Sequence, residues 1–365
     1  MTVPQLRPDD LASLRAAILD STGTIGIAGA GTAAGWGGAL RPVDAVLDTT
    51  GLSGVIVHNP GDMTVAVHAG TPLRTLQDEL APHGQQVSLD AARVADGATV
   101  GGLIATGDAG PSALVFGSLR DLVIGVTLVL ADGTVARSGG HVIKNVAGYD
   151  LAKLVHGSYG TLAVLAEVVL RLHPVPERRA TLAVPSTLAD AGELAAAVLG
   201  GPYEPAALEW VSTGAGGTLL TRLDGTEAAM EARLSRLRRV LPGATLTDDW
   251  AQHATAVRGG PDDAVLRIGT RPSRLPVVLT ALPARTITAG LGTGVATVTL
   301  DPADVAAAHD TVAEAGGTSV LRQRPTGATA PAWGPPPSAL GVLRAVKQSL
   351  DPDGRLGPGR FDPWM

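Results

Sequence analysis

Glycines recur in four short turns between residues 97 and 162, separated by apolar runs. The turns read Gly-Ala-Thr-Val-Gly-Gly-Leu at 97–103, Gly-Ser-Leu-Arg-Asp at 117–121, Lys-Asn-Val-Ala-Gly-Tyr-Asp-Leu at 144–151 and Gly-Ser-Tyr-Gly-Thr-Leu at 157–162. A glycine can adopt a positive φ, and its backbone N–H can approach an anion because no Cβ stands in the way. Several such turns in one segment predict a site for a large, phosphate-bearing cofactor.

A further glycine-rich loop, 29–38, follows a predicted strand at 24–28. The strand-then-loop order predicts a nest of backbone N–H groups for a pyrophosphate, to which the hydroxyl of Thr32 adds a hydrogen bond. The alternative is a turn that only connects two strands. The residues of this first phosphate wall are Gly29, Ala30, Gly31 and Thr32. A methyl group at position 30 is compatible with the site only if its φ is negative.

Thr99 is the predicted N-cap of a short helix that begins at Val100. The unpaired N–H groups and the positive dipole end of such a helix favour an anion. We therefore expect Thr99, Val100, Gly101 and Gly102 to form the second wall of the phosphate site.

The run 139–151, Gly-Gly-His-Val-Ile-Lys-Asn-Val-Ala-Gly-Tyr-Asp-Leu, together with 157–162, resembles the FAD-binding subunit of bacterial glycolate oxidase. More widely, the motifs resemble the PCMH-type FAD-binding domain of vanillyl-alcohol oxidase and the D-lactate dehydrogenases. The resemblance covers about 29–174 and returns at 343–361, whereas 175–335 matches only loosely. It implies FAD as the cofactor. The histidine that some relatives attach to the flavin has no counterpart here, so we expect noncovalent binding.

The resemblance also implies further cofactor contacts. A turn at Asp90 would close over the cofactor, although a solvated turn is an equal alternative. The small-residue loop 106–110 would lie against the flavin, and Asp108 departs from the neutral residue typical of that loop. Because an anion beside a diphosphate is unfavourable, we expect Asp108 to point away from the phosphates. The remaining implied contacts, which could also be simple packing residues, are Thr106, Gly110, Gly160, Thr161 and Val164.

Three residues of the 139–151 run are catalytic candidates: Lys144, Asn145 and Tyr149. A lysine beside the N1–C2=O edge of the flavin would stabilise the anionic reduced ring. Tyr149 could orient the substrate or contact the ring. The structural alternatives are that Lys144 extends to solvent, Asn145 caps a helix and Tyr149 packs.

A 2-hydroxy acid requires a cation for its carboxylate and a base for its hydroxyl proton. Arg267, Arg322 and Arg324, in or beside predicted strands, are the weak candidates for the cation, with surface arginines as the alternative. The His-x-Gly-Asp-Gly-Asn-His segment of catalytic D-2-hydroxyacid dehydrogenases is absent from the sequence. Its absence favours an electron-relaying FAD subunit over the subunit that oxidises glycolate.

The composition of the chain argues against several classes of partner and cofactor. The net charge of −6 argues against nucleic acid, and no apolar run is long enough to enter a membrane directly. The chain has no cysteine, so any iron–sulfur cluster belongs to a partner. The eight histidines show no metal-binding pair spacing, which predicts no metal site. The N-terminus lacks the pattern of a signal peptide, so we expect a cytoplasmic protein, at a membrane only through partners.

With 365 residues, the chain is long enough for two domains. The predicted fold class is α+β: a PCMH-type FAD-binding domain of two α/β subdomains (1–176), a smaller α+β cap domain that selects the substrate (177–330), and a linker, helix and tail that return to the FAD domain (331–365). The expected partners are a second FAD subunit and an iron–sulfur subunit, in the oxidation of glycolate or a related D-2-hydroxy acid. The alternatives are a stand-alone FAD-dependent dehydrogenase and a cofactor-free scaffold with the same fold.

Overall fold

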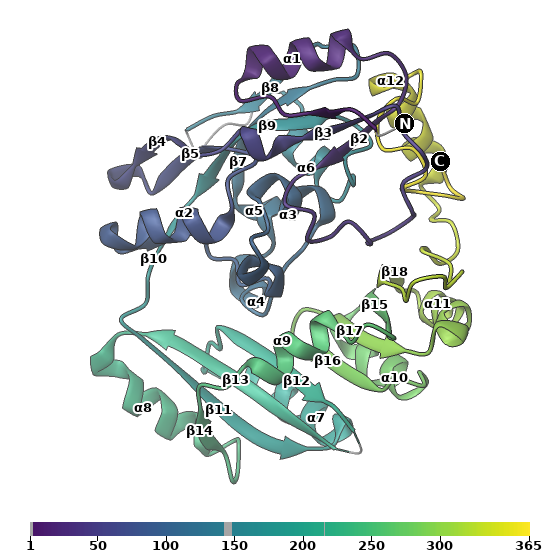
Figure 1. Ribbon diagram of the computed structural model, residues 1–365. Coiled ribbons are helices and arrows are strands. Elements are labelled where there is room, and N and C mark those ends of the chain that lie inside the picture. The colour runs from purple at the N-terminus through teal and green to yellow at the C-terminus, as the bar shows by residue number, and fades with distance from the viewer. Residues whose placement is uncertain (1–2, 142–147, 215) are drawn as a thin grey trace. The chain divides into compact units, whose positions relative to one another are not determined.

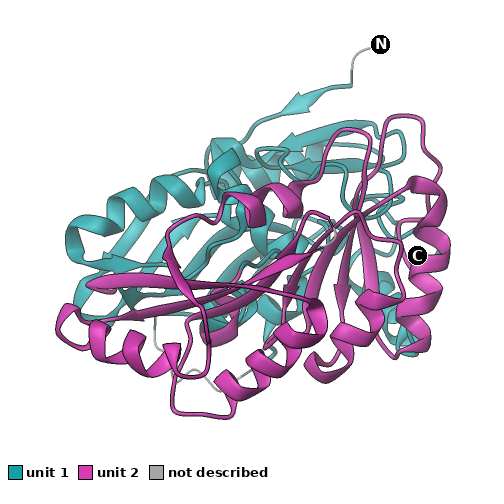
Figure 2. Ribbon diagram, turned by 90° about the horizontal axis from the view of Figure 1, so that it is seen from below, with its two compact units in different colours: residues 1–110, 116–175, 336–365 teal, residues 111–115, 176–335 magenta. Residues whose placement is uncertain are grey.

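The computed structural model describes residues 3–141, 148–214 and 216–365 (Figure 1). The chain divides into two compact units, coloured separately in Figure 2. Unit 1 consists of Met1–Gly110, Phe116–Val175 and Pro336–Met365, and unit 2 of Pro111–Val115 and Pro176–Pro335. The first division falls beside the expected domain boundary at residue 176, and the second lies a few residues beyond the expected one at 330. The short segment 111–115 of unit 2 had no counterpart in the predicted domains.

Unit 1 begins with a parallel three-stranded sheet in the order β1-β3-β2. Helix α1 (Leu11–Asp20) covers it, and its start is set by a capping box in which Asp10 accepts a 2.6 Å hydrogen bond from the backbone N–H of Ser13. The buried face of α1 carries Leu14 and Ile18. The strands are β1 (Gln5–Leu6), β2 (Ile25–Ala28) and β3 (Ala45–Asp48).

A second, antiparallel sheet of unit 1 has the order β4-β5-β9-β7-β8. Its hairpin β7-β8 turns at Asp132-Gly133, where Gly133 has a φ of 78° that glycine adopts without strain. The strands are β4 (Val55–Asn59), β5 (Thr64–His68), β7 (Val123–Val129), β8 (Val135–Gly139) and β9 (Val164–Arg171). A two-stranded pair joins β6 (Gln85–Gln86) to β10 (His173–Pro174).

Short helices pack on this sheet around a core of leucine, valine and alanine side chains. They are α2 (Leu73–Leu80), α3 (Val100–Thr106), α5 (Leu119–Leu122) and α6 (Leu151–Val155); α4 (Ala113–Phe116) spans the boundary between the units. The Thr-Pro pair before α2 suggests a threonine cap, but Pro72 occupies the N-cap position. The hydroxyl of Thr71 instead donates to the carbonyl of His68 (2.7 Å) and accepts from the N–H of Gly54 (2.9 Å).

Unit 2 contains one antiparallel sheet of eight strands, in the order β14-β11-β13-β12-β16-β17-β15-β18. The strands are β11 (Arg178–Ser186), β12 (Ala207–Ser212), β13 (Gly217–Gly225), β14 (Thr245–Thr247), β15 (Ala264–Gly269), β16 (Thr286–Gly290), β17 (Val295–Leu300) and β18 (Thr318–Gln323). The helices are α7 (Leu188–Leu199), α8 (Glu227–Arg238), α9 (Ala251–Arg258), α10 (Leu275–Thr280) and α11 (Val305–Glu314).

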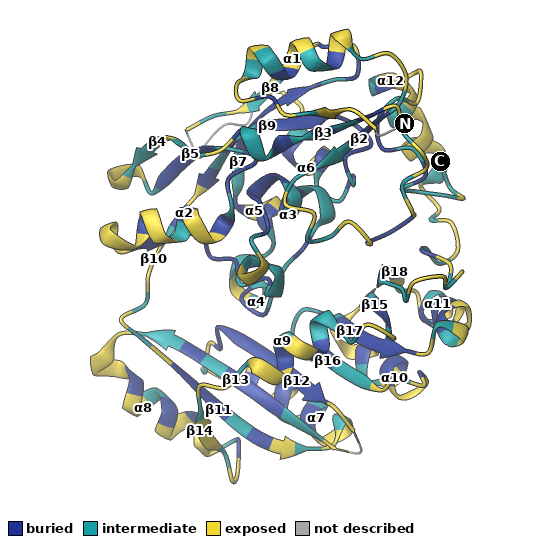
Figure 3. Ribbon diagram, in the orientation of Figure 1, coloured by how far each residue is buried: buried dark blue, intermediate teal, exposed yellow. Residues whose placement is uncertain are grey.

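Strand β12 shows how this sheet is covered on both faces, because all six of its residues are buried (Figure 3). Leu208 and Trp210 join the main hydrophobic core of unit 2. Glu209 alternates to the opposite face, where α9 packs, and its carboxylate lies 3.5 Å from Nε2 of His253. The sheet is therefore a scaffold with one apolar face and one partly polar face.

The C-terminal segment Pro336–Met365 belongs to unit 1 and contains helix α12 (Leu340–Leu350). Leu356 bridges Ile25 of β2 in parallel fashion. The guanidinium of Arg355 donates to four backbone carbonyls, those of Ile18, Ser21, Gly23 and Ala131. These contacts agree with the tail of the predicted fold, and the α+β class is confirmed by the arrangement of helices and sheets.

Candidate cofactor site

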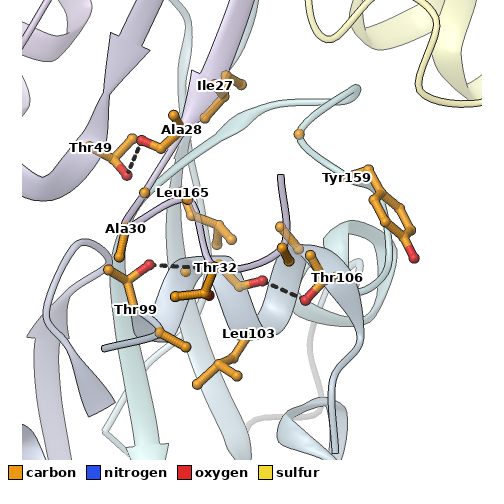
Figure 4. Close-up of a pocket in the computed structure, with 18 of the residues that line it drawn as sticks. Ile27, Ala28, Ala30, Thr32, Thr49, Thr99, Leu103, Thr106, Tyr159 and Leu165 are labelled. Atoms are coloured by element: carbon orange, nitrogen blue, oxygen red, sulfur yellow. Dashed lines mark hydrogen bonds between the residues drawn. The ribbon is translucent and has the colours of Figure 1, made fainter. Parts of the chain in front are cut away.

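A cavity with about 970 Å³ of empty space, part of it open solvent, lies within unit 1 (Figure 4). Three segments that are far apart in the sequence line most of it: the loop after β2, helix α3 with the residues that follow it, and 158–165. The predicted cofactor residues that line it are Gly29, Ala30, Gly31, Thr32, Thr99, Gly101, Gly102, Thr106 and Gly160.

The loop after β2 has the backbone that an anion nest requires. Gly31 has a φ of 73°, and no protein atom lies within 4 Å of where its Cβ would be. Among the described residues, the side-chain-bearing ones with a positive φ are Met63, Tyr159 and Glu204, so Ala30 satisfies the condition that its φ be negative. The loop therefore has a glycine in the left-handed conformation at the cavity wall, as a backbone nest requires.

Helix α3 approaches this loop closely at its N-terminus. Thr99 caps the helix by accepting a 3.1 Å hydrogen bond from the N–H of Gly102. A Cβ on Gly29 would lie 2.6 Å from the hydroxyl oxygen of Thr99, and one on Gly101 would lie 3.0 Å from Ala69. Only glycine allows both approaches, and the two expected phosphate walls are thus adjacent.

The third wall is the turn before β9. Tyr159 takes the left-handed conformation with a φ of 53°, and its N–H donates to the carbonyl of Ala105 (2.8 Å). Its ring meets that of Phe361 edge to face, with centroids 5.7 Å apart. The turn is therefore tied both to α3 and to the C-terminal segment.

Between these walls the cavity is lined by apolar side chains, which suit a planar ring system. They come from β2, α3, β9 and the residue before β9, namely Ile27, Leu103, Ala105, Ala163 and Leu165. Ile27, Leu103 and Leu165 are labelled in Figure 4. A glycine nest beside an apolar chamber matches a ligand with a diphosphate and flat rings, so the residues present fit FAD.

Three charged residues also line the cavity, and two of them were missed from the sequence: Arg93 and Arg360. Arg93 precedes the Gly-Ala-Thr-Val-Gly-Gly motif, and Arg360 ends the Gly-Pro-Gly-Arg tail, so position beside a recognised motif was the available signal. The third, Asp108, is 3% exposed, and its carboxylate accepts a 3.0 Å hydrogen bond from the N–H of Ala109. Asp108 follows the C-terminus of α3, whereas the expected phosphate wall is at its N-terminus.

Five predicted cofactor residues do not line the cavity. Val100, Thr161 and Val164 are buried in the protein interior, and the hydroxyl of Thr161 donates to the carbonyl of Ser158 (2.7 Å). Asp90 and Gly110 pack against each other, since a Cβ on Gly110 would overlap the Asp90 carbonyl. Their assignment to the cofactor stays a prediction.

None of the catalytic candidates is among the described residues that line this cavity. Lys144 and Asn145 lie outside them. Tyr149 is 91% exposed, and its carbonyl accepts a 2.6 Å hydrogen bond from the hydroxyl of Ser138. It borders a separate, more polar depression together with Asp150 and Lys153, which form a 2.7 Å ion pair. The catalytic roles of all three stay predictions.

The three candidate substrate arginines belong to unit 2, whereas every residue lining the cavity belongs to unit 1. Arg267 lies on β15, and Arg322 lies on β18 with 2% of its surface exposed. Burial lowers the pKa of Arg324, which follows β18. Their role in substrate binding stays a prediction.

Two findings concern metals and membranes. Among residues 3–141, 148–214 and 216–365, no cluster of three or more His, Cys, Asp or Glu side chains could hold a metal ion. Within the same residues, no helix combines the length and apolar composition needed to cross a bilayer.

The N-terminal part of the chain is similar to known FAD-binding proteins. Residues 7–139 match the family model of an FAD binding domain. These residues thus match the FAD-binding domain that the motifs predicted. Glycolate oxidase subunit GlcE of Escherichia coli is 39% identical to it over 145 residues, which are 40% of this chain and 41% of GlcE.

Two other relatives match over similar lengths. D-lactate dehydrogenase of Archaeoglobus fulgidus is 39% identical over 165 residues (45% of this chain, 36% of the relative). Glycolate oxidase subunit GlcD of Bacillus subtilis is 40% identical over 114 residues (31% and 24%). The matched segments thus span less than half the length of these curated relatives. The predicted resemblance to a glycolate oxidase subunit is confirmed over these segments.

Solved structures of alkyldihydroxyacetonephosphate synthase share the fold. The superposition covers 97% of this chain and 75% of that chain, with a TM-score of 0.72 and 14% sequence identity. At this identity the likeness concerns the fold alone, and it agrees with the α+β architecture described above.

Proposed function

We propose that this chain is an FAD-dependent oxidoreductase subunit that takes part in oxidising glycolate or a related D-2-hydroxy acid. The observation that carries the proposal is the cavity in which the Gly29–Thr32 loop, the N-terminus of α3 and Gly160 meet. Similarity to two glycolate oxidase subunits and a D-lactate dehydrogenase supports the reaction class.

In this proposal the chain binds FAD noncovalently. Among the described residues that line the cavity there is no histidine, the residue that some relatives attach to the flavin. Bound FAD supplies a two-electron acceptor for hydride. The apolar walls around Leu103 and Leu165 hold the ring and exclude water, while the glycine loop holds the phosphates.

The remaining roles extend the proposal to the residues predicted from the sequence. Lys144 and Asn145 stabilise negative charge on the reduced ring, and Tyr149 orients the substrate. Arg267, Arg322 and Arg324 supply cations for the carboxylate of the hydroxy acid. Each of these roles follows from the family resemblance or from residue chemistry and is open to substitution tests.

We further propose that a second FAD subunit and an iron–sulfur subunit act as partners. The names of the similar proteins GlcE and GlcD describe subunits of glycolate oxidase, which supports a multi-subunit assembly. Because this chain has no cysteine, an iron–sulfur cluster would be held by the partner.

The visible absorption spectrum of the purified chain, before and after anaerobic addition of glycolate and D-lactate, tests the proposal. A flavin spectrum that stays oxidised until the partner subunits are added supports the relaying subunit. A spectrum that either acid bleaches in the isolated chain indicates a stand-alone dehydrogenase. A colourless protein that does not bind added FAD would leave only the scaffold and would contradict the proposal.

A further inference from the structure

Two arginines that are far apart in the sequence reach the glycine-rich loop after β2. Arg93 lies in the short 3₁₀ helix Ala92–Asp96, and its Nη1 donates to the carbonyl of Thr32 (2.9 Å). Its guanidinium carbon is 4.5 Å from the centroid of the Trp36 ring, a cation–π contact that holds the group in place. Arg93 is therefore fixed by two residues of the loop and also lines the cavity.

Arg360 comes from the C-terminal segment. Its Nη1 donates to the carbonyls of Ala34 (2.8 Å) and Gly38 (3.2 Å). The backbones are joined as well, because the N–H of Gly38 donates to the carbonyl of Arg360 (2.9 Å). A Cβ on Gly38 would overlap the carbonyl of Gly359, so glycine is required for this close approach. Arg360 thus has a fixed place at the same loop and lines the same cavity.

We propose that Arg93 and Arg360 bind the diphosphate of FAD through their positive charge, in addition to shaping the loop that carries the backbone nest. This inference rests on the proposed FAD site. A diphosphate brings two negative charges to a chain whose own net charge is −6, so local cations are needed to offset repulsion. Guanidinium groups suit this task because they stay protonated and bind phosphate oxygens in a planar, directional way.

The two arginines lie at the wall expected to hold the phosphates and not at the apolar chamber expected to hold the ring. Their contacts lie at residues 32–38, at the loop wall, and the apolar chamber is formed by other residues of β2, α3 and β9. If the arginines bind phosphate, their removal weakens ligands with a diphosphate and spares a flavin without one. If they only shape the loop that carries the phosphate nest, FAD affinity also falls, but its dependence on salt concentration stays that of the wild type.

The experiment uses the full chain freed of flavin, titrated with FAD, ADP and riboflavin by calorimetry. We expect Arg93→Gln and Arg360→Gln each to weaken FAD and ADP by about tenfold to a hundredfold, as the loss of one charge-assisted contact predicts. Riboflavin should change less than about twofold. Raising the salt concentration should weaken FAD binding less in either variant than in the wild type.

Arg41→Gln is the matched control. Arg41 also ties the C-terminal segment to this region, through hydrogen bonds of 2.9 and 2.7 Å to the carboxylate of Asp362, but it does not line the cavity. Its FAD affinity should equal that of the wild type. Arg93→Lys and Arg360→Lys keep the charge but lose the planar guanidinium, so their FAD affinity should lie between that of the wild type and that of the glutamine variants.

The outcomes separate the inference from the proposed function. Unchanged FAD affinity in both glutamine variants overturns the inference and leaves the FAD site intact. A wild-type salt dependence of FAD binding in both glutamine variants also overturns it, because the arginines would then only position the loop. An equal loss for riboflavin and FAD overturns it as well, because the effect would then not be specific to the diphosphate. A wild-type chain that binds none of the three ligands overturns the inference together with the proposed function.

Discussion

The two units of this protein differ in whether backbone or side-chain groups carry their polar chemistry. In unit 1 the candidate site is lined by a loop, a helix N-terminus and a turn in which glycine, alanine and threonine are common, together with apolar side chains of β2, α3 and β9. In unit 2 the backbone N–H and C=O groups of the strands are paired in an eight-stranded antiparallel sheet. Its polar groups are side chains of the strands, such as Glu209 and Arg267. A cofactor shared by many enzymes can be held by backbone, whereas a site that selects one substrate depends on side chains.

This contrast predicts that replacing a glycine of positive φ by valine lowers the stability of either unit similarly but weakens FAD binding only in unit 1. Gly31 in unit 1 and Gly316 in unit 2 have φ values of 73° and 71°, and neither has a protein atom within 4 Å of its Cβ position. Substituting valine at either place costs a similar amount of stability, about 1–2 kcal/mol or somewhat more for a β-branched residue. Gly31→Val should also weaken FAD binding by about a hundredfold, because the side chain occupies the cavity wall.

Thermal unfolding and FAD titration of both valine variants check this prediction. Gly316→Val serves as the control and should bind FAD with wild-type affinity. Wild-type affinity in Gly31→Val would show that the loop is not part of the cofactor site and would break the contrast.

A substitution in unit 2 should do the reverse and act on the substrate. Arg267→Gln removes a proposed carboxylate partner, so the dissociation constant of glycolate or D-lactate from the FAD-loaded protein should rise by roughly tenfold to a hundredfold. The visible spectrum of bound FAD should be unchanged. The perturbation of that spectrum by the hydroxy acid gives the constant, and Arg271→Gln, at an exposed arginine of the same unit, is the control. Equal constants in both variants would exclude Arg267 from the substrate site.

The next prediction concerns charge beside the flavin. Replacing buried Asp108, which lines the cavity, with Asn removes a negative charge that opposes the anionic reduced ring. The flavin reduction potential should rise by about 30 mV, the value of a tenfold change in a two-electron couple. Lys144→Met should shift the potential in the opposite direction while FAD stays bound. Spectroelectrochemistry of both variants provides the measurement.

Glu209 supplies the comparison from unit 2 for this measurement. It is 7% exposed and paired with His253, so Glu209→Gln removes a buried carboxylate outside the cavity. Its potential should equal that of the wild type. A shift as large as that of Asp108→Asn would show that the flavin senses both units and would blur the distinction between them.

The smallest expected effect is a pH dependence of stability carried by His309 in unit 2. Burial lowers the pKa of His309 below its usual 6.5, and its Nδ1 lies 2.6 Å from the hydroxyl of Ser319. The unfolded chain therefore binds this proton more readily, and the stability contributed by the neutral ring is lost as the pH falls below 6.5. The melting temperature should fall between about pH 7.5 and 5.5, and less so in His309→Asn.

Burial and the nearby Arg171 also lower the pKa of His173 in unit 1. Differential scanning calorimetry of the His309→Asn and His173→Asn variants at both pH values assigns the effect to each unit. An identical pH dependence in His309→Asn and in the wild type would contradict the first assignment.

Regular elements with a strong local signal were predictable. Helices α7 and α12 have such a signal, since an N-cap or an apolar period of 3.6 is a property of neighbouring residues. Strand β16 and helix α9 have a weaker one. β16 is short and rich in threonine and small residues, and the side chain of Trp250, at the N-cap of α9, makes no capping hydrogen bond. β16 forms because it pairs with β12 and β17, and α9 forms because it packs on β12, β16 and β17.

At the site, the glycine turns and the cap at Thr99 follow from local sequence, because positive φ values and N-caps are conformations of one or a few residues. Three other features depend on the folded chain: Arg93 and Arg360 meet at one loop, Asp108 lines the cavity, and Tyr159 contacts Phe361. Those contacts join distant segments through the register of strands and the return of the tail. Local residue patterns do not encode that register, because it depends on which buried surfaces fit together.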